Sequence, residues 1–229
     1  EKLGDDARAE ASASRALRLD PSNLDALFVM TDLCFEKRRY VEARAHYSRV
    51  ADRLEGLGAE IAVPALVRYV DALAQSGSTE GALTAVDTLL RLAPHDAEAL
   101  GRVAQVTFSH GSPKRAAELE ADYLRRFGAT LTDDERALAS YRLGESLRKL
   151  GNLPEAVQKL EESAELNPSL AAPLEALATA YTELDRPADV IRAKTRHLDR
   201  ADGDERVQLV LDIGDVAGAK LGDRTLATK

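Results

Sequence analysis

The chain has 229 residues, 39 of them acidic and 31 basic, and its formal net charge is -8 at pH 7. This charge repels a phosphate backbone, so we expect no nucleic-acid partner. A single cysteine excludes an internal disulfide, and no apolar run reaches the roughly 18 residues that a membrane-spanning helix requires. Aromatic residues make up 4% of the chain, while Ala, Leu, Arg and Glu dominate it, which favours an all-α fold.

A pattern of small residues followed by proline occurs three times along the chain. The copies are Gly4, Ala9, Ala16 and Pro21; Gly77, Ala82, Leu89 and Pro94; and Gly151, Ala156, Ser163 and Pro168. Weaker copies without the proline begin at Arg38, Gly111, Asp185 and Gly222. The spacing between starting positions runs 34, 39, 34, 40, 34 and 37 residues, so the repeating unit is a pair of repeats.

Each copy carries the signals of a helical hairpin. In Gly111-Ser112-Pro113, glycine suits a left-handed helix end, serine can cap the next helix, and proline suits its first turn. The small residue five positions later, as at Ala156, lets two helices approach closely. Proline then stops the second helix before a residue that can cap the next one, which is Asn23, Asp96 or Ser169.

The joints without proline are longer and predict a different kind of hairpin. Thr132-Asp133-Asp134-Glu135 has the sequence of a capping box, so the helix after it should begin about one turn earlier than in the other repeats. We therefore expect short and long hairpins to alternate along the chain.

The 34-residue helix-turn-helix period with this placement of Gly, Ala and Pro resembles the tetratricopeptide repeat. Residues 139–168 match best, with Leu143-Gly144 as the family's Leu-Gly pair and Gly151 as the turn between helices. The resemblance implies a right-handed superhelical α-solenoid. The chain departs from the family where a large aromatic residue is usual near the start of the first helix, since it has Leu27, Leu66, Leu100, Ser140 and Leu174 there.

We expect a single solenoid over residues 1–229. Its predicted parts are the second helix of a partial repeat (1–23), five repeats (24–62, 63–96, 97–136, 137–170 and 171–206) and a truncated repeat (207–229). Both ends fall inside repeats, which predicts a fragment of a longer array that can self-associate through its uncapped ends.

The residue types that carry catalysis or bind metals are scattered. The histidines His46, His95, His110 and His197 lie far apart, and no HExxH, phosphate-binding loop or nucleophile motif occurs. We assign Cys34 to the core. We therefore predict no catalytic, cofactor or metal site and no enzymatic activity, although carboxylates of different repeats could still meet in space.

The resemblance implies that the first helix of each repeat lines a concave groove for a partner. The candidate groove residues are Phe28, Asp32, Phe35, Arg68, Asp71, Arg102, Gln105, Phe108, Tyr141, Arg142, Glu145 and Thr179. Arg68, Arg102 and Arg142 could present guanidinium groups to an acidic or C-terminal peptide. Alternatively, each arginine pairs with an acidic residue along or between helices and leaves the groove neutral. The aromatic candidates could instead hold apolar side chains of a partner.

The function that fits these features best is a protein-interaction scaffold that binds a peptide or helix of a partner protein. The alternative is a regulatory or targeting segment of a larger enzyme whose catalytic domain lies outside these residues. We expect a soluble chain without a membrane span or a cofactor. The compartment stays open, with the cytoplasm slightly favoured.

Overall fold

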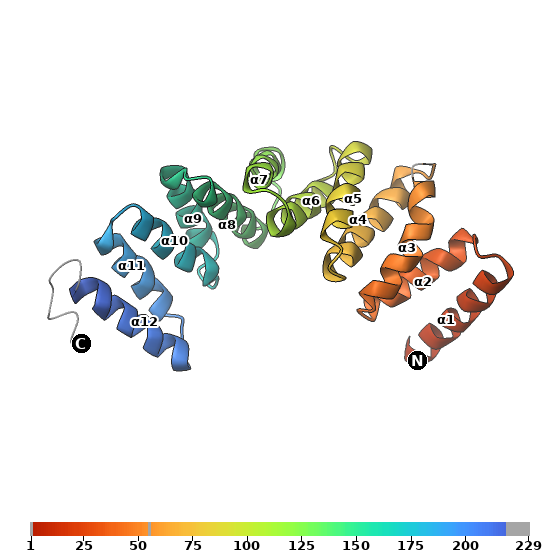
Figure 1. Ribbon diagram of the computed structural model, residues 1–229, viewed down its shortest axis with the longest axis horizontal. Coiled ribbons are helices and arrows are strands. Elements are labelled where there is room, and N and C mark those ends of the chain that lie inside the picture. The colour runs from red at the N-terminus through yellow and green to blue at the C-terminus, as the bar shows by residue number, and fades with distance from the viewer. Residues whose placement is uncertain (1, 55, 219–229) are drawn as a thin grey trace. The chain divides into compact units, whose positions relative to one another are not determined.

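The computed structural model describes residues 2–54 and 56–218, which form twelve helices and no strand (Figure 1). The helices are α1 (Lys2–Leu19), α2 (Leu24–Glu36), α3 (Tyr40–Leu54), α4 (Ala59–Gln75), α5 (Thr79–Leu92), α6 (Ala97–His110), α7 (Pro113–Phe127), α8 (Asp133–Lys149), α9 (Leu153–Leu166), α10 (Ala172–Glu183), α11 (Pro187–Leu198) and α12 (Gly203–Val216). The all-α prediction is confirmed. Among the described residues, no helix is both long enough and apolar enough to span a membrane.

The chain divides into two compact units at one of the predicted turns. The N-terminal unit ends at Gly111 and contains α1 to α6, and the C-terminal unit begins at Ser112 and contains α7 to α12. Consecutive helices pack against each other within each unit. A continuous solenoid over residues 1–229 stays a prediction, as does the packing of a hairpin across residues 111–113.

Side-chain caps explain where several helices begin. Asn23, Asp96 and Ser112 each accept a hydrogen bond from the backbone N–H three residues ahead. Thr132 and Glu135 form the complete capping box that the sequence predicts. Ser169 was expected to cap α10, and this is wrong. Helix α10 begins at Ala172, and the Ser169 N–H donates instead to the Asn167 side chain at 2.9 Å in the loop before it.

Four of the predicted turns share a left-handed residue. Gly77 and Gly151 have φ values of 76° and 80°, and Arg38 and Asp185 occupy the equivalent positions with φ values of 56° and 52°. The weak sequence copies therefore form the same turn as the strong ones, although a side chain at positive φ adds strain. Gly111 does not have the expected left-handed backbone, since its φ is -94°. Glycine fits there because a Cβ would lie 2.8 Å from the Thr107 carbonyl oxygen.

The predicted alternation of short and long hairpins is visible in the first helices. Helices α4 and α8 have 17 residues each, whereas α2, α6 and α10 have 13, 14 and 12. Helices α4, α8 and α12 begin at Ala59, Asp133 and Gly203, four residues before the repeat boundaries expected at 63, 137 and 207. The last predicted turn, at Gly222, lies outside the described residues.

Small residues set the spacing between the two helices of a hairpin. Ala82 and Ala156 are fully buried. At Gly144, an added Cβ would lie 2.7 Å from Cγ of Leu160 and 3.1 Å from the carbonyl oxygen of Ala156. The Leu-Gly pair of the sequence is thus explained by the close contact of α8 with α9. Cys34 is fully buried, which confirms its assignment to the core.

Candidate functional site

In the N-terminal unit, two ion pairs connect successive first helices. Arg68 of α4 pairs with Asp32 of α2, and Nε of Arg102 in α6 lies 3.3 Å from Oδ1 of Asp71 in α4. Each arginine lies nine residues before its turn, and each aspartate lies six residues before the preceding turn. Arg102 also donates to Oε1 of Gln105 at 3.0 Å along its own helix. These charges are therefore balanced within the unit.

The second of these pairs is the more buried. The Asp71 side chain is 18% exposed, whereas Arg68 and Asp32 are 46% and 44% exposed. Burial raises the pKa of Asp71, and Arg102 opposes this shift. The hydrogen bond to Asp32 raises the pKa of Arg68. Both arginines thus connect neighbouring repeats.

In the C-terminal unit, Arg142 points into the protein. It pairs with Glu120 of α7 through two hydrogen bonds, of which Nη2 to Oε2 is 3.1 Å long. The Glu120 side chain is fully buried and the Arg142 side chain is 13% exposed. Burial raises the pKa of Glu120, and the Arg142 guanidinium opposes this shift. Arg142 is therefore not presented to a partner in the way that the sequence hypothesis of three parallel arginines requires.

Two other candidates of the C-terminal unit take part in its internal contacts. Glu145 pairs with Arg148 of its own helix at 2.8 Å, and Arg148 also pairs with Glu183 of α10. Tyr141 packs against the apolar cluster of α9, α10 and α11, and burial raises its pKa. The arginine that connects neighbouring first helices here is thus Arg148, six residues further along the helix than Arg142.

The aromatic candidates are partly exposed. Phe28, Phe35 and Phe108 are each half-buried on the first helices of the N-terminal unit. The ring of Phe35 contacts the ring of Tyr40 edge to face, with centroids 5.6 Å apart. Part of each phenylalanine ring therefore remains accessible on the face that the sequence assigned to a partner.

Sequence reasoning missed Glu120, although the sequence contains a signal for it. Nine residues after a turn, the second helices α3, α5 and α9 carry Tyr47, Val86 and Leu160, which are fully buried, whereas α11 carries Lys194, which is partly exposed. Glu120 occupies the same position in α7. A carboxylate at a position that is in the core of three other second helices predicts a buried partner of opposite charge.

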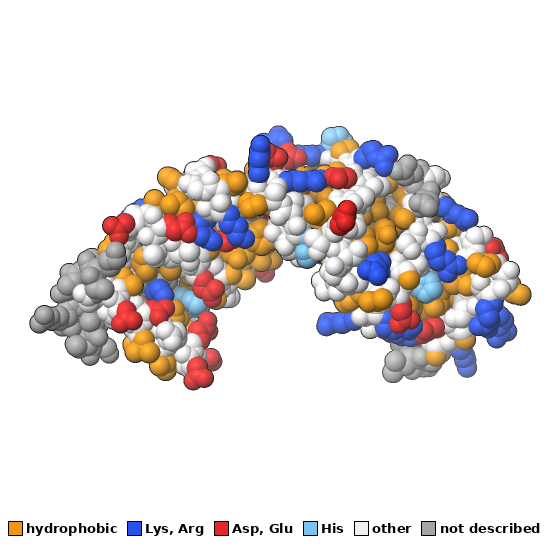
Figure 2. All heavy atoms as spheres, viewed as in Figure 1, with side chains coloured by type: hydrophobic (Ala, Val, Ile, Leu, Met, Phe, Trp, Pro, Cys, Tyr) orange, Lys and Arg blue, Asp and Glu red, His pale blue; other side chains and the backbone are white. Residues whose placement is uncertain are grey.

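The recess formed by α10, α11 and α12 of the C-terminal unit has a volume of about 560 Å³, and we call it the acidic pocket. Its lining residues are Leu174, Glu175, Ala178, Thr179, Thr182, Glu183, Lys194, His197, Glu205, Gln208, Leu209 and Asp212. Its only lysine, Lys194, is paired with Asp212 at 2.5 Å. Figure 2 shows acidic side chains gathered over these helices. Of the candidate groove residues, Thr179 lies in this pocket.

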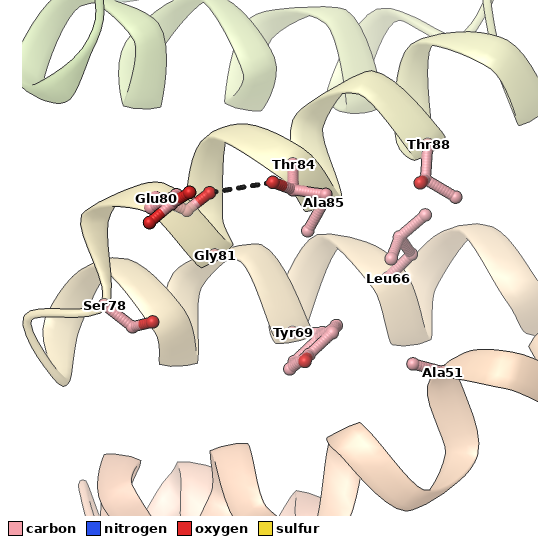
Figure 3. A pocket seen from close by; sticks show the side chains of 9 residues that line it. All are labelled: Ala51, Leu66, Tyr69, Ser78, Glu80, Gly81, Thr84, Ala85 and Thr88. Atoms are coloured by element: carbon pink, nitrogen blue, oxygen red, sulfur yellow. Dashed lines mark hydrogen bonds between the residues drawn. The ribbon is translucent and has the colours of Figure 1, made fainter.

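A second recess lies among α3, α4 and α5 of the N-terminal unit (Figure 3). It has a volume of about 710 Å³ and is lined mostly by small and hydroxyl side chains, with Leu66 and Tyr69 of α4 between the two second helices. Thr84 donates its hydroxyl to the Glu80 carbonyl at 3.0 Å. This recess offers one charged group, Glu80, and lies away from the first-helix positions that the sequence assigned to a partner.

Comparisons with known proteins agree with the observed architecture. A sequence model described as Tetratricopeptide repeat matches residues 1–56 and 70–129, and a second model with the same description matches residues 137–170. A search of curated proteins gave no significant match.

Several solved structures share the fold. MamA from Desulfovibrio magneticus RS-1 superposes with a TM-score of 0.67 at 19% identity, covering 79% of this chain and 95% of that one. YrrB, described as a TPR protein with an unusual peptide-binding site, gives a TM-score of 0.65 at 14% identity, covering 86% of this chain and 96% of that one. Another MamA structure gives 0.59 at 22% identity, covering 69% and 88%.

These likenesses support the fold, and the first family model spans more than half of the sequence. The chain therefore belongs to the tetratricopeptide repeat family.

Proposed function

We propose that this chain is a protein-interaction scaffold that binds a segment of a partner protein along its first helices. Proteins of this family typically bind other proteins and are not catalytic. The observation that carries the proposal is the acidic pocket, which lies between the first helices α10 and α12 and includes Thr179. A recess of this volume is large enough to hold one or two side chains of a peptide.

The lining of the acidic pocket favours a basic segment. Leu174, Ala178 and Leu209 provide an apolar surface, and four carboxylates surround it, of which Glu183 and Asp212 already pair with basic residues. An apolar side chain next to a lysine or arginine fits this combination. An acidic partner has less support, because Arg68, Arg102 and Arg142 are all ion-paired.

The proposal can be tested with peptides selected from a random display library on the purified chain. We expect the enriched peptides to carry a basic residue beside an apolar one. Thr179→Lys fills the mouth of the pocket and should reduce the affinity of a labelled peptide by at least tenfold. Thr195→Lys is the matched control, because Thr195 is an exposed threonine of α11 outside the pocket and its substitution should leave affinity unchanged.

Two outcomes would contradict binding at this pocket. Equal loss of affinity in both threonine variants would show a non-specific charge effect. Enrichment of acidic peptides whose binding is abolished by Arg102→Glu would locate the partner on the arginine-bearing helices of the N-terminal unit.

A further inference from the structure

His197 of the acidic pocket is a histidine at a repeat position that is apolar or small in the other second helices. Twelve residues after a turn, the second helices α3, α5, α7 and α9 carry Val50, Leu89, Tyr123 and Ser163, which are all buried. Ten residues before a turn, the other first helices carry Phe28, Val67, Gly101, Tyr141 and, in α12, Asp212. Among the described residues, this repeat alone combines a histidine at the first position with a carboxylate at the second.

The fold brings these two residues to a third from the next helix. Nε2 of His197 in α11 lies 3.3 Å from Oε1 of Glu205 in α12 and 4.0 Å from Oε1 of Glu175 in α10. The three ligand atoms all lie within 4.8 Å of one another. The His197 side chain is only 5% exposed, and Nε2 faces both carboxylates at the pocket, while Glu175 and Glu205 are 60% and 56% exposed.

We propose that Glu175, His197 and Glu205 form a binding site for a divalent transition-metal ion of the zinc class. Zinc binds imidazole nitrogen and carboxylate oxygen at about 2.0–2.2 Å, so the ligand atoms of a tetrahedral site are about 3.3–3.5 Å apart. The His197–Glu205 distance matches that spacing, and the exposed Glu175 carboxylate, whose oxygen lies 4.0 Å from Nε2 of His197, has to move inward to reach it. By contrast, a direct charge-assisted hydrogen bond would hold the atoms at about 2.7–2.9 Å.

The type of ion follows from the ligands. One imidazole with two carboxylates suits zinc, because magnesium and calcium prefer oxygen ligands alone. Two carboxylates balance the charge of a divalent cation, and three protein ligands leave the fourth position of a tetrahedron for water or a donor group of another molecule.

The expected consequence is a cross-link among three helices. Each ligand comes from a different helix, and the buried side chains of α12 are those of Leu209 and Ile213. A bound ion would therefore attach α12 to the hairpin of α10 and α11. The site does not require a bound peptide, because its three ligands are already together, but an ion there would compete with a basic peptide for Glu175 and Glu205.

The test is a titration of the metal-free 229-residue chain with Zn²⁺, followed by calorimetry, and with Co²⁺, followed by visible absorption. We expect one tightly bound ion per chain and the absorption bands of tetrahedral cobalt. Glu175→Gln and Glu205→Gln should each weaken Zn²⁺ binding by at least tenfold, as should His197→Gln. Because both glutamates are exposed, their variants should keep the circular dichroism of the parent chain.

Asp204→Asn is the matched control, since Asp204 is an exposed neighbour of Glu205 outside the cluster. This variant should bind Zn²⁺ with the same affinity as the parent chain. Hydrogen exchange of the α12 amides should slow at least threefold when Zn²⁺ is added to the parent chain and stay unchanged in Glu205→Gln. Failure of the parent to bind one equivalent, or equal affinity in the parent and both glutamate variants, would overturn the proposal. Peptide affinity measured without metal tests the scaffold function separately.

Discussion

Arg68 in the N-terminal unit and Arg142 in the C-terminal unit occupy the same repeat position, nine residues before a turn, but they have different environments. Arg68 lies on the protein surface and pairs with Asp32 of the preceding first helix. Arg142 is largely buried and pairs with Glu120 of a second helix. The position in the repeat therefore does not determine whether an arginine is exposed or buried, or which helix supplies its partner.

The residue opposite the arginine makes the difference. In the N-terminal unit, the equivalent second-helix position holds Tyr47 or Val86, neither of which offers a carboxylate, so each arginine pairs with an aspartate of the preceding first helix. In the C-terminal unit, the same position holds Glu120, whose burial would be costly without a partner. The glutamate in α7 thus explains why the arginine of α8 is buried and ion-paired inside the unit.

The largest effect is expected from breaking the buried pair. Glu120→Ala should lower the free energy of unfolding of the C-terminal unit by about 3–5 kcal/mol, because it leaves the Arg142 charge buried without a counter-ion. The measurement is urea denaturation followed by circular dichroism, with hydrogen exchange of α7 and α8 to localise the loss.

The double variant Glu120→Leu with Arg142→Met distinguishes the cost of an unpaired buried charge from the net contribution of the ion pair to stability. Since apolar side chains of similar volume replace buried ion pairs well, its stability should lie within about 1 kcal/mol of the parent or above it. A loss below about 1 kcal/mol in Glu120→Ala would mean that solvent reaches the pair.

Much of the fold could be predicted from the sequence, because its determinants are local. The spacing of turn residues predicted the helical hairpins, and the capping box at Thr132 predicted the early start of α8. The left-handed turns at Arg38 and Asp185 could be placed only by their spacing, since neither residue is a glycine. Gly111 was misjudged because its glycine is needed for a close approach to Thr107, which depends on local packing.

The candidate site was less predictable, because its contacts join different helices. The sequence identified Arg68 and Asp71 as first-helix residues, but the pairing of each arginine with the acidic residue of the preceding repeat depends on how the helices are aligned. The cluster of Glu175, His197 and Glu205 joins three helices and was not predicted. Comparison of equivalent repeat positions would have identified His197 as unusual, whereas Asp212 of α12 shares the position of Glu175.

Acidification should reveal a second difference in stability between the two units, because a paired carboxylate of the N-terminal unit becomes protonated. Glu10 of α1 pairs with Arg39 at 2.6 Å and Lys37 at 2.8 Å, and these hydrogen bonds lower its pKa to about 2. Because the folded-state pKa lies below the ordinary value, this stabilisation is present above about pH 4.5 and is lost as the pH falls toward 2. Glu10→Gln should cost about 0.5–1 kcal/mol at pH 7.

The variant should also have a flatter dependence of stability on pH between 4.5 and 2, measured by urea denaturation at several pH values. The pKa shift of Glu120 has the opposite sign to that of Glu10. Its raised pKa makes its contribution to stability fall as the pH rises from the ordinary value of a glutamate through the raised one. An unchanged pH profile in Glu10→Gln would mean that Glu10 is not paired in solution.

The smallest effect is expected for the exposed pair of Arg68 and Asp32. In a double-mutant cycle with Arg68→Ala and Asp32→Ala, the coupling energy should be about 0.2–0.5 kcal/mol, because solvent screens both side chains. It should fall further in 1 M salt, where the screening length is about 3 Å. The same cycle on Arg142 and Glu120 should give several times this coupling and little salt dependence, since water and ions are excluded there. Equal couplings in the two units would show that burial does not separate the two arginines, and the contrast between the units would then rest on geometry alone.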